Sequence, residues 1–321
     1  MLFVLSSRLC ARTWPPTIWP RESRPSWTGG PPSSPVAEPW LAARPTHSHP
    51  RARLSRAFIL RKNMKIEDNV ALVSGGASGL GEACVRRFIE QGARGVAVLD
   101  MNVERGKALQ EEFGDRILFV ETDIADEAAV NAAVETTTDK FGALHVLVAA
   151  AAMAGPAKLV GKRGPIPMEI FDRVVKVNLY GTIHLLRATV SAMLRNEPTE
   201  DGERGVTIAV SSGAAFEGQI GQIAYSATKA ALVGLTMPVA RELAEHGVRM
   251  VTVAPGAFDT PIYASVPDTV KDGLIGAALF PKRLGRASEF ASFAEEIVRN
   301  PMHNGRTYRL DAGTILPVSA D

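Results

Sequence analysis

Short apolar runs alternate with amphipathic stretches through most of this chain. Seven runs have the length and composition of buried strands: residues 70–74, 96–100, 117–121, 144–149, 206–211, 249–254 and 306–310. Between the first two, apolar side chains recur at helical spacing at Leu80, Cys84, Val85, Phe88 and Ile89. This alternation is typical of a parallel sheet with helices on both faces. We therefore predict a single doubly wound α/β domain with seven parallel strands.

The composition changes near residue 63. Residues 1–62 contain nine Arg and one Lys against two Glu, with ten Pro and all four Trp of the chain. The remainder has 26 Lys and Arg against 32 Asp and Glu, so the net charge of +2 comes from the first segment. We predict a disordered or targeting extension over 1–63 and a domain over 64–321. Arg8, Arg12 and the lack of acidic residues nearby favour a mitochondrial presequence; a start at Met64 and a cytoplasmic protein is the alternative.

Composition also excludes several classes of protein. The chain has no run of about 18 apolar residues, so we expect no membrane span. Cys10 and Cys84 are the only cysteines, which excludes a disulfide framework and favours a reducing compartment. The acidic domain argues against autonomous binding of nucleic acid.

A glycine-rich turn follows the first predicted strand and opens a helix, with the spacing G-x-x-x-G-x-G at Gly75, Gly79 and Gly81. Gly75 permits a sharp turn, Gly79 gives a pyrophosphate access to the backbone, and Gly81 allows close packing of helix and sheet. The helix N-terminus would then face the anion. A glycine turn that binds no phosphate is the alternative. The context favours a Rossmann-type dinucleotide site.

The second predicted strand ends in Asp100, nineteen residues after Gly81. A carboxylate there can accept hydrogen bonds from the adenosine ribose and would repel a 2′-phosphate, so we predict NAD and not NADP. Asp123, after the third strand, is a candidate for the adenine side. Asp126 is equally suited to cap the next helix. A solvated acid at the end of a strand is the alternative for Asp100.

Tyr225 and Lys229 are four residues apart, and Ser212 lies thirteen residues before Tyr225. On a helix, this spacing puts the phenol and the ammonium on one face. A nearby positive charge would lower the pKa of Tyr225 toward the range useful for proton transfer. The pattern indicates a hydride-transfer site. A surface pair is the alternative for Tyr225 and Lys229, and Ser211 competes with Ser212.

With these motifs, the chain over residues 64–321 resembles the short-chain dehydrogenase/reductase family. Within that family it is most similar to 3-hydroxyacyl-CoA dehydrogenases of type 2, also called 17β-hydroxysteroid dehydrogenases of type 10. The similarity is carried by SGGASGLGEA, NEPTEDGERGV, AAFEGQIGQIAYSATKAALVGLTMPVAREL and APGAFDTPI. Long matches in loops are more specific than short motifs, because loops usually vary.

The resemblance implies a catalytic tetrad of Asn178, Ser212, Tyr225 and Lys229. Ser212 would bind the substrate oxygen, Tyr225 would exchange its proton, Lys229 would also hold the nicotinamide ribose, and Asn178 would fix a water. Gln219 would contact substrate together with Ser212 and Tyr225, and no metal is implied. The cofactor would contact Gly75, Ser78, Gly79, Leu80, Gly81, Asp100, Asp123, Ile124, Ala150, Tyr225, Lys229, Phe258 and Thr260.

The chain departs from the family after the fourth predicted strand. Where the family has N-[NC]-A-G, residues 149–152 are all Ala. An Ala forced to positive φ would be strained, so we expect an altered turn or a less rigid site.

The segment 154–169 is long for a connection and carries Lys158, Lys162 and Arg163. These cations are candidates for the phosphates of coenzyme A, and a solvated basic loop is an equal alternative. Near Gln219, an acyl chain or steroid could pack against apolar residues: Phe216, Ile220, Ile262 and Val266.

The leading hypothesis is NAD-dependent oxidation of a secondary alcohol, (S)-3-hydroxyacyl-CoA, in mitochondria. A hydroxysteroid or another secondary alcohol is the second hypothesis. The third is a scaffold subunit of a mitochondrial tRNA-processing complex, which the resemblance also implies. The family further implies a homotetramer through the helix of Tyr225, where small residues permit close approach at Ala227, Ala230, Ala231 and Gly234. Pro238 should kink that helix.

Overall fold

The computed structural model describes residues 63–162, 164–261 and 267–318. The predictions for residues 1–62 and for Arg163, Ile262 and Val266 therefore lie outside the described residues.

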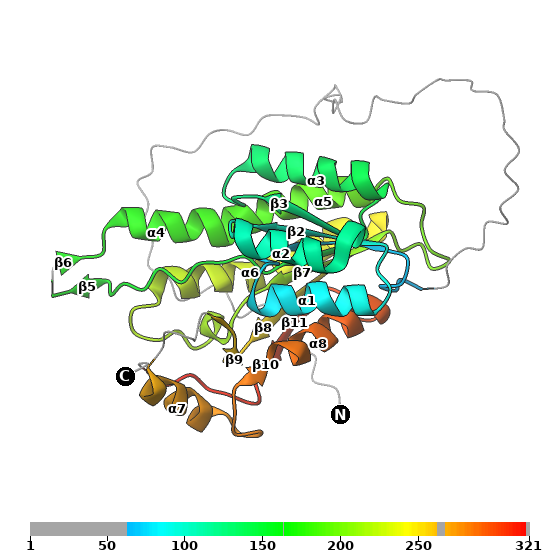
Figure 1. The fold of residues 1–321 in the computed structure, drawn as a ribbon. Helices are drawn as coiled ribbons and strands as arrows, with labels where there is room; N and C mark the ends of the chain where they lie inside the picture. The colour runs from blue at the N-terminus through cyan, green and yellow to red at the C-terminus, as the bar shows by residue number, and fades with distance from the viewer. Residues whose placement is uncertain (1–62, 163, 262–266, 319–321) are drawn as a thin grey trace, which may run out of the picture. The chain divides into compact units, whose positions relative to one another are not determined.

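The core of the domain is a seven-stranded sheet in which every neighbouring pair is parallel. Its order is β11-β8-β7-β4-β1-β2-β3 (Figure 1). All seven predicted strands are confirmed, each within two residues of its expected ends. They are β1 Val70–Ser74, β2 Gly95–Asp100, β3 Ile117–Glu121, β4 Val146–Ala149, β7 Gly205–Val210, β8 Val248–Pro255 and β11 Thr307–Leu310.

Helices cover both faces of this sheet, as the alternating pattern predicts. One face packs against α1 (Gly79–Glu90), α2 (Val103–Phe113) and α8 (Ala287–Arg299). The other packs against α3 (Glu127–Phe141), α5 (Gly181–Met193) and α6 (Ile223–Leu243). In Figure 1, α1 and α8 lie side by side, as do α3 and α5.

Shorter elements complete the domain. They are α4 (Met168–Val175), a π-helical turn (Lys176–Tyr180), α7 (Asp268–Ala277), three 3₁₀ turns (Gly114–Arg116, Gly213–Ala215 and Ala244–His246), the pair β5 (Val160–Gly161) and β6 (Gly164–Pro165), and the pair β9 (Phe258–Asp259) and β10 (Gly285–Arg286). The segment expected to be a basic loop therefore contains a small hairpin. It lies beyond the N-terminal end of α4 in Figure 1.

Strand β1 shows why the sequence selects this arrangement. All five of its residues are buried. Ala71 and Val73 belong to the core on one face, and Val70 and Leu72 belong to the core on the other. Because successive side chains on a strand point to opposite faces, an uninterrupted apolar run fits only a sheet covered twice.

One local expectation for the helices is confirmed and another stays open. Asp126 caps α3, because its Oδ1 accepts from the N–H groups of Ala128 at 2.8 Å and Ala129 at 3.2 Å. Helix α6 continues through Pro238 for a total of 21 residues, and the expected kink at that proline stays a prediction.

Helix α6 with the turn after it, Ile223–His246, is long and apolar enough to cross a membrane by length and composition. The expectation of no membrane span came from the lack of a longer apolar run in the sequence. The length and apolar composition of this helix are weak evidence for a span, because the core helix of a soluble domain passes the same test. Here the helix packs against β8 and its Lys229 is buried.

A buried ion pair holds the end of α8. The Arg249 Nε donates to the Glu203 Oε1 at 2.7 Å, and both side chains are less than one-tenth exposed. The remaining Arg249 nitrogens donate to the carbonyls of Ile297, Val298, Asn300 and His303 at 2.7–3.3 Å. Arg249 therefore supplies donors to the carbonyls of Ile297 and Val298 in the last turn of α8, where a helix leaves carbonyls unpaired.

Replacing Arg249 with Ala should lower the free energy of unfolding by about 3 kcal/mol or more, because it leaves the Glu203 carboxylate buried without its partner. Urea unfolding at one fixed protein concentration measures the change. The control is Arg195→Ala, at an exposed arginine, which should alter stability by less than about 0.5 kcal/mol. Equal effects of the two variants would contradict this account of Arg249.

Candidate active site

A cavity of ≈ 550 Å³ lies at the carboxyl ends of the parallel strands. This is where ligands bind in open α/β sheets, because each strand delivers its following loop to the same edge. All thirteen residues expected to bind cofactor line this cavity, and Ser212 lines it too. The residues predicted to bind cofactor are therefore brought together around one cavity, and their contacts with a cofactor stay a prediction.

The glycine turn is built on close backbone approach. Gly75 has φ +66°, and a Cβ there would lie 2.8 Å from the backbone nitrogen of Ala151. A Cβ at Gly81 would lie 2.1 Å from the carbonyl oxygen of Gly75. The expected roles of Gly75 in the turn and of Gly81 in close packing are confirmed. Gly79 also has positive φ, +55°, and faces Thr260 across the cavity, where a Cβ would come within 3.3 Å.

Asp100 both lines the cavity and holds the turn. Its Oδ2 accepts from the Ala77 N–H at 3.0 Å, and its Oδ1 accepts from the Asn102 N–H at 2.9 Å. The carbonyl of Ala77 accepts a hydrogen bond from the Arg105 Nε at 2.7 Å. Arg105 was not among the predicted site residues, because it lies on α2, five residues after Asp100, and no local motif links it to the glycine turn.

The structure brings Ser212, Tyr225 and Lys229 together on the cavity wall. The side chains of Ser212 and Tyr225 are hydrogen-bonded to each other. The Lys229 Nζ lies 5.7 Å from the centre of the Tyr225 ring and donates to the Val210 carbonyl at 2.7 Å. The hydroxyl of Ser211 instead donates to the Lys229 carbonyl at 2.8 Å, so Ser212 is the serine beside the tyrosine.

The expected electrostatics of this group need correction. Burial raises the pKa of Tyr225, and the hydrogen bond with Ser212 only partly offsets this. Burial also lowers the pKa of Lys229 to about 8. The expected net lowering of the pKa of Tyr225 is therefore contradicted in the protein without cofactor, while the effect of a cationic Lys229 on the phenolate stays a prediction. The spacing indicated that the two groups are neighbours, but it gave no measure of how strongly burial opposes charge.

Asn178 lies in the π-helical turn between α4 and α5 and is fully buried. Its Oδ1 accepts from the Met153 N–H at 2.8 Å, while its Nδ2 donates to the Met153 carbonyl at 3.0 Å and to the Thr228 hydroxyl at 3.2 Å. That hydroxyl donates to the Tyr225 carbonyl at 2.9 Å. The amide thus fixes the loop after β4 to the helix of Tyr225. Its expected role in holding a water stays a prediction.

The four-alanine turn is relaxed. Among the described residues other than glycine, positive φ occurs at Asp68 and Ala312 and at none of residues 149–152. The Ala150 N–H donates to the Ser74 carbonyl at 3.2 Å, and the Ala151 N–H donates to the Ser74 hydroxyl at 3.3 Å. This turn uses no left-handed residue and is hydrogen-bonded to β1, which agrees with the expected altered turn; a less rigid site stays a prediction.

The structure keeps several other predicted contacts away from the cavity. Within the described part of the chain, Gln219 is not among the residues that line it. Its amide is nearly buried and pairs with that of Gln222 at 3.0 Å. Lys158 and Lys162 are exposed on and beside the β5–β6 hairpin. Phe216 and Ile220 are also exposed, and Arg309 covers the ring of Phe216 at 5.1 Å.

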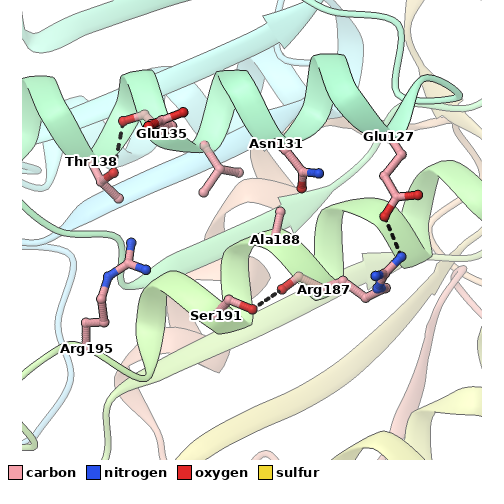
Figure 2. Close-up of a pocket in the computed structure, with 9 residues that line it drawn as sticks. Glu127, Asn131, Glu135, Thr138, Arg187, Ala188, Ser191 and Arg195 are labelled. Carbon is pink, nitrogen blue, oxygen red and sulfur yellow. Dashed lines mark hydrogen bonds and ion pairs between the residues drawn. The ribbon is translucent and has the colours of Figure 1, made fainter. Parts of the chain in front are cut away.

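A second cavity of ≈ 360 Å³ lies between α3 and α5 (Figure 2). Glu127 and Arg187 form an ion pair of 2.5 Å across it, and Arg195 extends beside it. Its lining contains none of the residues expected to be catalytic. It is a polar surface groove, separate from the site at the strand ends.

A parallel sheet, a glycine turn at a helix N-terminus, an acid at the end of β2 and a serine–tyrosine–lysine group define the class of nicotinamide-dependent oxidoreductases. The family model described as short chain dehydrogenase matches residues 69–271. The chain belongs to the short-chain dehydrogenase family.

Relatives within this family are similar over nearly their whole length. The chain is 44% identical to "3-hydroxyacyl-CoA dehydrogenase type-2" of Drosophila melanogaster, over 77% of this chain and 97% of the relative. It is 43% identical to the protein of that name from Homo sapiens, over 75% and 93% of the two chains. A crystal structure titled 3-hydroxyacyl-CoA dehydrogenase type-2 from Mycobacterium avium has a TM-score of 0.74 and 39% identity, covering 79% of this chain and 99% of that one. The expected resemblance is confirmed.

The buried Lys229 predicts a pH dependence of stability. Its pKa is about 8 in the folded protein against an ordinary value of 10.5. The unfolded chain therefore binds more protons between these values, and the folded protein gains stability as the pH rises through them. We expect the stability of wild type minus that of Lys229→Met to increase by about 3 kcal/mol from pH 8 to 10.5.

Urea unfolding across this pH range measures the difference. Lys107→Met, at an exposed lysine of α2, serves as the control and should show no such slope. A flat profile for Lys229→Met would contradict the lowered pKa.

Proposed function

We propose that this chain is an NAD-dependent dehydrogenase of the mitochondrial matrix that interconverts (S)-3-hydroxyacyl-CoA and 3-ketoacyl-CoA. The observation that carries the chemistry is the hydrogen-bonded Ser212–Tyr225 pair with Lys229 beside it on the cavity wall. The acyl-CoA substrate is supported by the names of the relatives. The mitochondrial location is supported by the basic, proline-rich composition of residues 1–62.

The residues present fit a dinucleotide cofactor. The glycine turn offers backbone N–H groups at the start of α1, where a pyrophosphate is favoured by the helix dipole. Lys229 lines the same cavity and would hold the nicotinamide ribose, while Thr260 lies beside Gly79 and would contact the cofactor next to the glycine turn. When bound, the nicotinamide accepts or donates the hydride.

The protein's own part is the movement of the proton. In the oxidation direction, Ser212 holds the substrate hydroxyl, and Tyr225 takes its proton as the hydride leaves the same carbon. In the reverse direction, the Tyr225 phenol donates this proton to the oxygen of a ketone as the hydride reaches the carbon. A cationic Lys229 near the ring would stabilise the phenolate formed during oxidation.

The preference for NAD is supported by Asp100. Its carboxylate lies at the end of β2 and lines the cavity. It can accept hydrogen bonds from ribose hydroxyls and would repel the 2′-phosphate of NADP.

The function is tested by following NADH oxidation with acetoacetyl-CoA. We expect saturable turnover with NADH, weaker turnover with NADPH, and a loss of about 10²-fold or more in Tyr225→Phe, which removes the proton donor. Tyr308→Phe is the control, because Tyr308 lies on β11 and pairs with His303 outside the cavity. Wild type that binds NADH but does not reduce acetoacetyl-CoA would refute the acyl-CoA assignment and direct the search to hydroxysteroids and other secondary alcohols.

We also propose that the chain forms a homotetramer through α6. The helix exposes a stripe of small residues at Ala227, Ala230, Gly234 and Pro238, spaced three or four apart. At Gly234 an added Cβ would meet nothing within 4 Å in the single chain. A smooth face of this kind allows another helix to pack closely.

Light scattering should therefore give the mass of four chains for the wild type and a smaller mass for Ala230→Arg, which places a charged side chain in the stripe. The control is Ala108→Arg, on an exposed position of α2 at the other face of the sheet, which should keep the tetramer. A monomeric wild type would reject the assembly. A tetramer that survives Ala230→Arg would place the interface elsewhere.

A further inference from the structure

The peptide of Ala77, in the middle of the glycine turn, is held from both sides. Ala77 is fully buried. Its N–H donates to the Asp100 carboxylate at 3.0 Å, and its carbonyl accepts from the Arg105 Nε at 2.7 Å. The acid that faces the ribose side of the cavity and an arginine of α2 are thus joined through one residue.

The same arginine is occupied at its far end. The Arg105 Nη2 donates to the Glu82 carboxylate, whose side chain is only 16% exposed. Glu82 also accepts from the Arg86 Nε at 2.9 Å. Arg86 is further bound by Glu112 through two hydrogen bonds of 2.6 and 2.9 Å. Glu82 therefore binds both Arg105 and Arg86, whereas Glu112 binds Arg86 and not Arg105.

This arrangement matters because NADP differs from NAD by a phosphate on the adenosine ribose. A guanidinium binds phosphate through paired hydrogen bonds, and an arginine near the acid of this turn is the usual means of accepting that phosphate. Arg105 has the right chemistry and binds the same residue, Ala77, as Asp100 does, but its donors are directed to Ala77 and Glu82.

We infer that Glu82 is a second determinant of cofactor choice, which acts by holding the Arg105 guanidinium away from a 2′-phosphate. Asp100 repels the phosphate directly, and Glu82 withholds the Arg105 guanidinium from it. Arg105 itself is a positioning residue for NAD, since it fixes the carbonyl of Ala77. The inference rests on the proposed NAD preference of the Asp100 site.

The test measures dissociation constants of NADPH and NADH by fluorescence titration, together with the thermal shift that each cofactor produces. The variants are Asp100→Ser alone, Asp100→Ser with Glu82→Ala, and Asp100→Ser with Glu112→Ala. The last is the matched control, because it removes the same charge from a helix and releases only the two Nη atoms of Arg86, while Arg105 stays bound to Glu82. A fourth variant adds Arg105→Ala to the Asp100→Ser, Glu82→Ala pair.

We expect Glu82→Ala to tighten NADPH binding in the Asp100→Ser background by about tenfold or more relative to Glu112→Ala, the factor expected for a hydrogen bond to a charged group. Adding Arg105→Ala should abolish this gain. Equal gains for Glu82→Ala and Glu112→Ala, or a gain that persists without Arg105, would overturn the inference.

Measuring NADPH and NADH binding to the wild type tests the proposed NAD preference separately from the role of Glu82. If the wild type binds NADPH as tightly as NADH, the proposed NAD preference fails. The comparison of Glu82→Ala with Glu112→Ala still decides whether Glu82 restrains Arg105.

Discussion

Burial of the sheet on both faces is the constraint on which the rest of the molecule depends. With helices packed against each face, the interior strands have no exposed side on which polar chemistry could be placed. Because all neighbours in the sheet are parallel, the loops after every strand meet at one edge. The cofactor turn after β1, the acid of β2 and the serine after β7 therefore face one cavity although they are far apart in sequence.

The same burial sets the cost of the chemistry. Lys229 is almost completely covered, and its pKa falls because the charged form loses hydration. Burial raises the pKa of the Tyr225 phenol for the same reason, because its charged form is the phenolate. Ser212 and the Val210 carbonyl give the two groups hydrogen bonds that partly offset these penalties. A dinucleotide bound in the cavity would change this balance, since it adds charged and polar groups beside both side chains.

Most of the fold and much of the site could be read from the sequence, because period and spacing determine them. Apolar runs fix the strands, and the four-residue interval between Tyr225 and Lys229 fixes a shared helical face. What could not be read depends on contacts between distant segments. No local sequence pattern indicates the hydrogen bonds between distant residues. These are the bonds of Asn178 with Met153, of Arg249 with the end of α8, and of Arg105 with Ala77.

The alanine turn likewise left two possibilities open at the level of the sequence. The family motif ends in glycine, so four alanines at residues 149–152 predicted either an altered turn or a less rigid site. The structure forms the turn in ordinary conformations and pairs it with Ser74 of the neighbouring strand. Gly75, across from it, keeps the close approach to Ala151 that any side chain would prevent. The space that the cofactor needs is therefore maintained from the β1 side of the turn, which explains how this chain keeps the site without the family's asparagine and glycine.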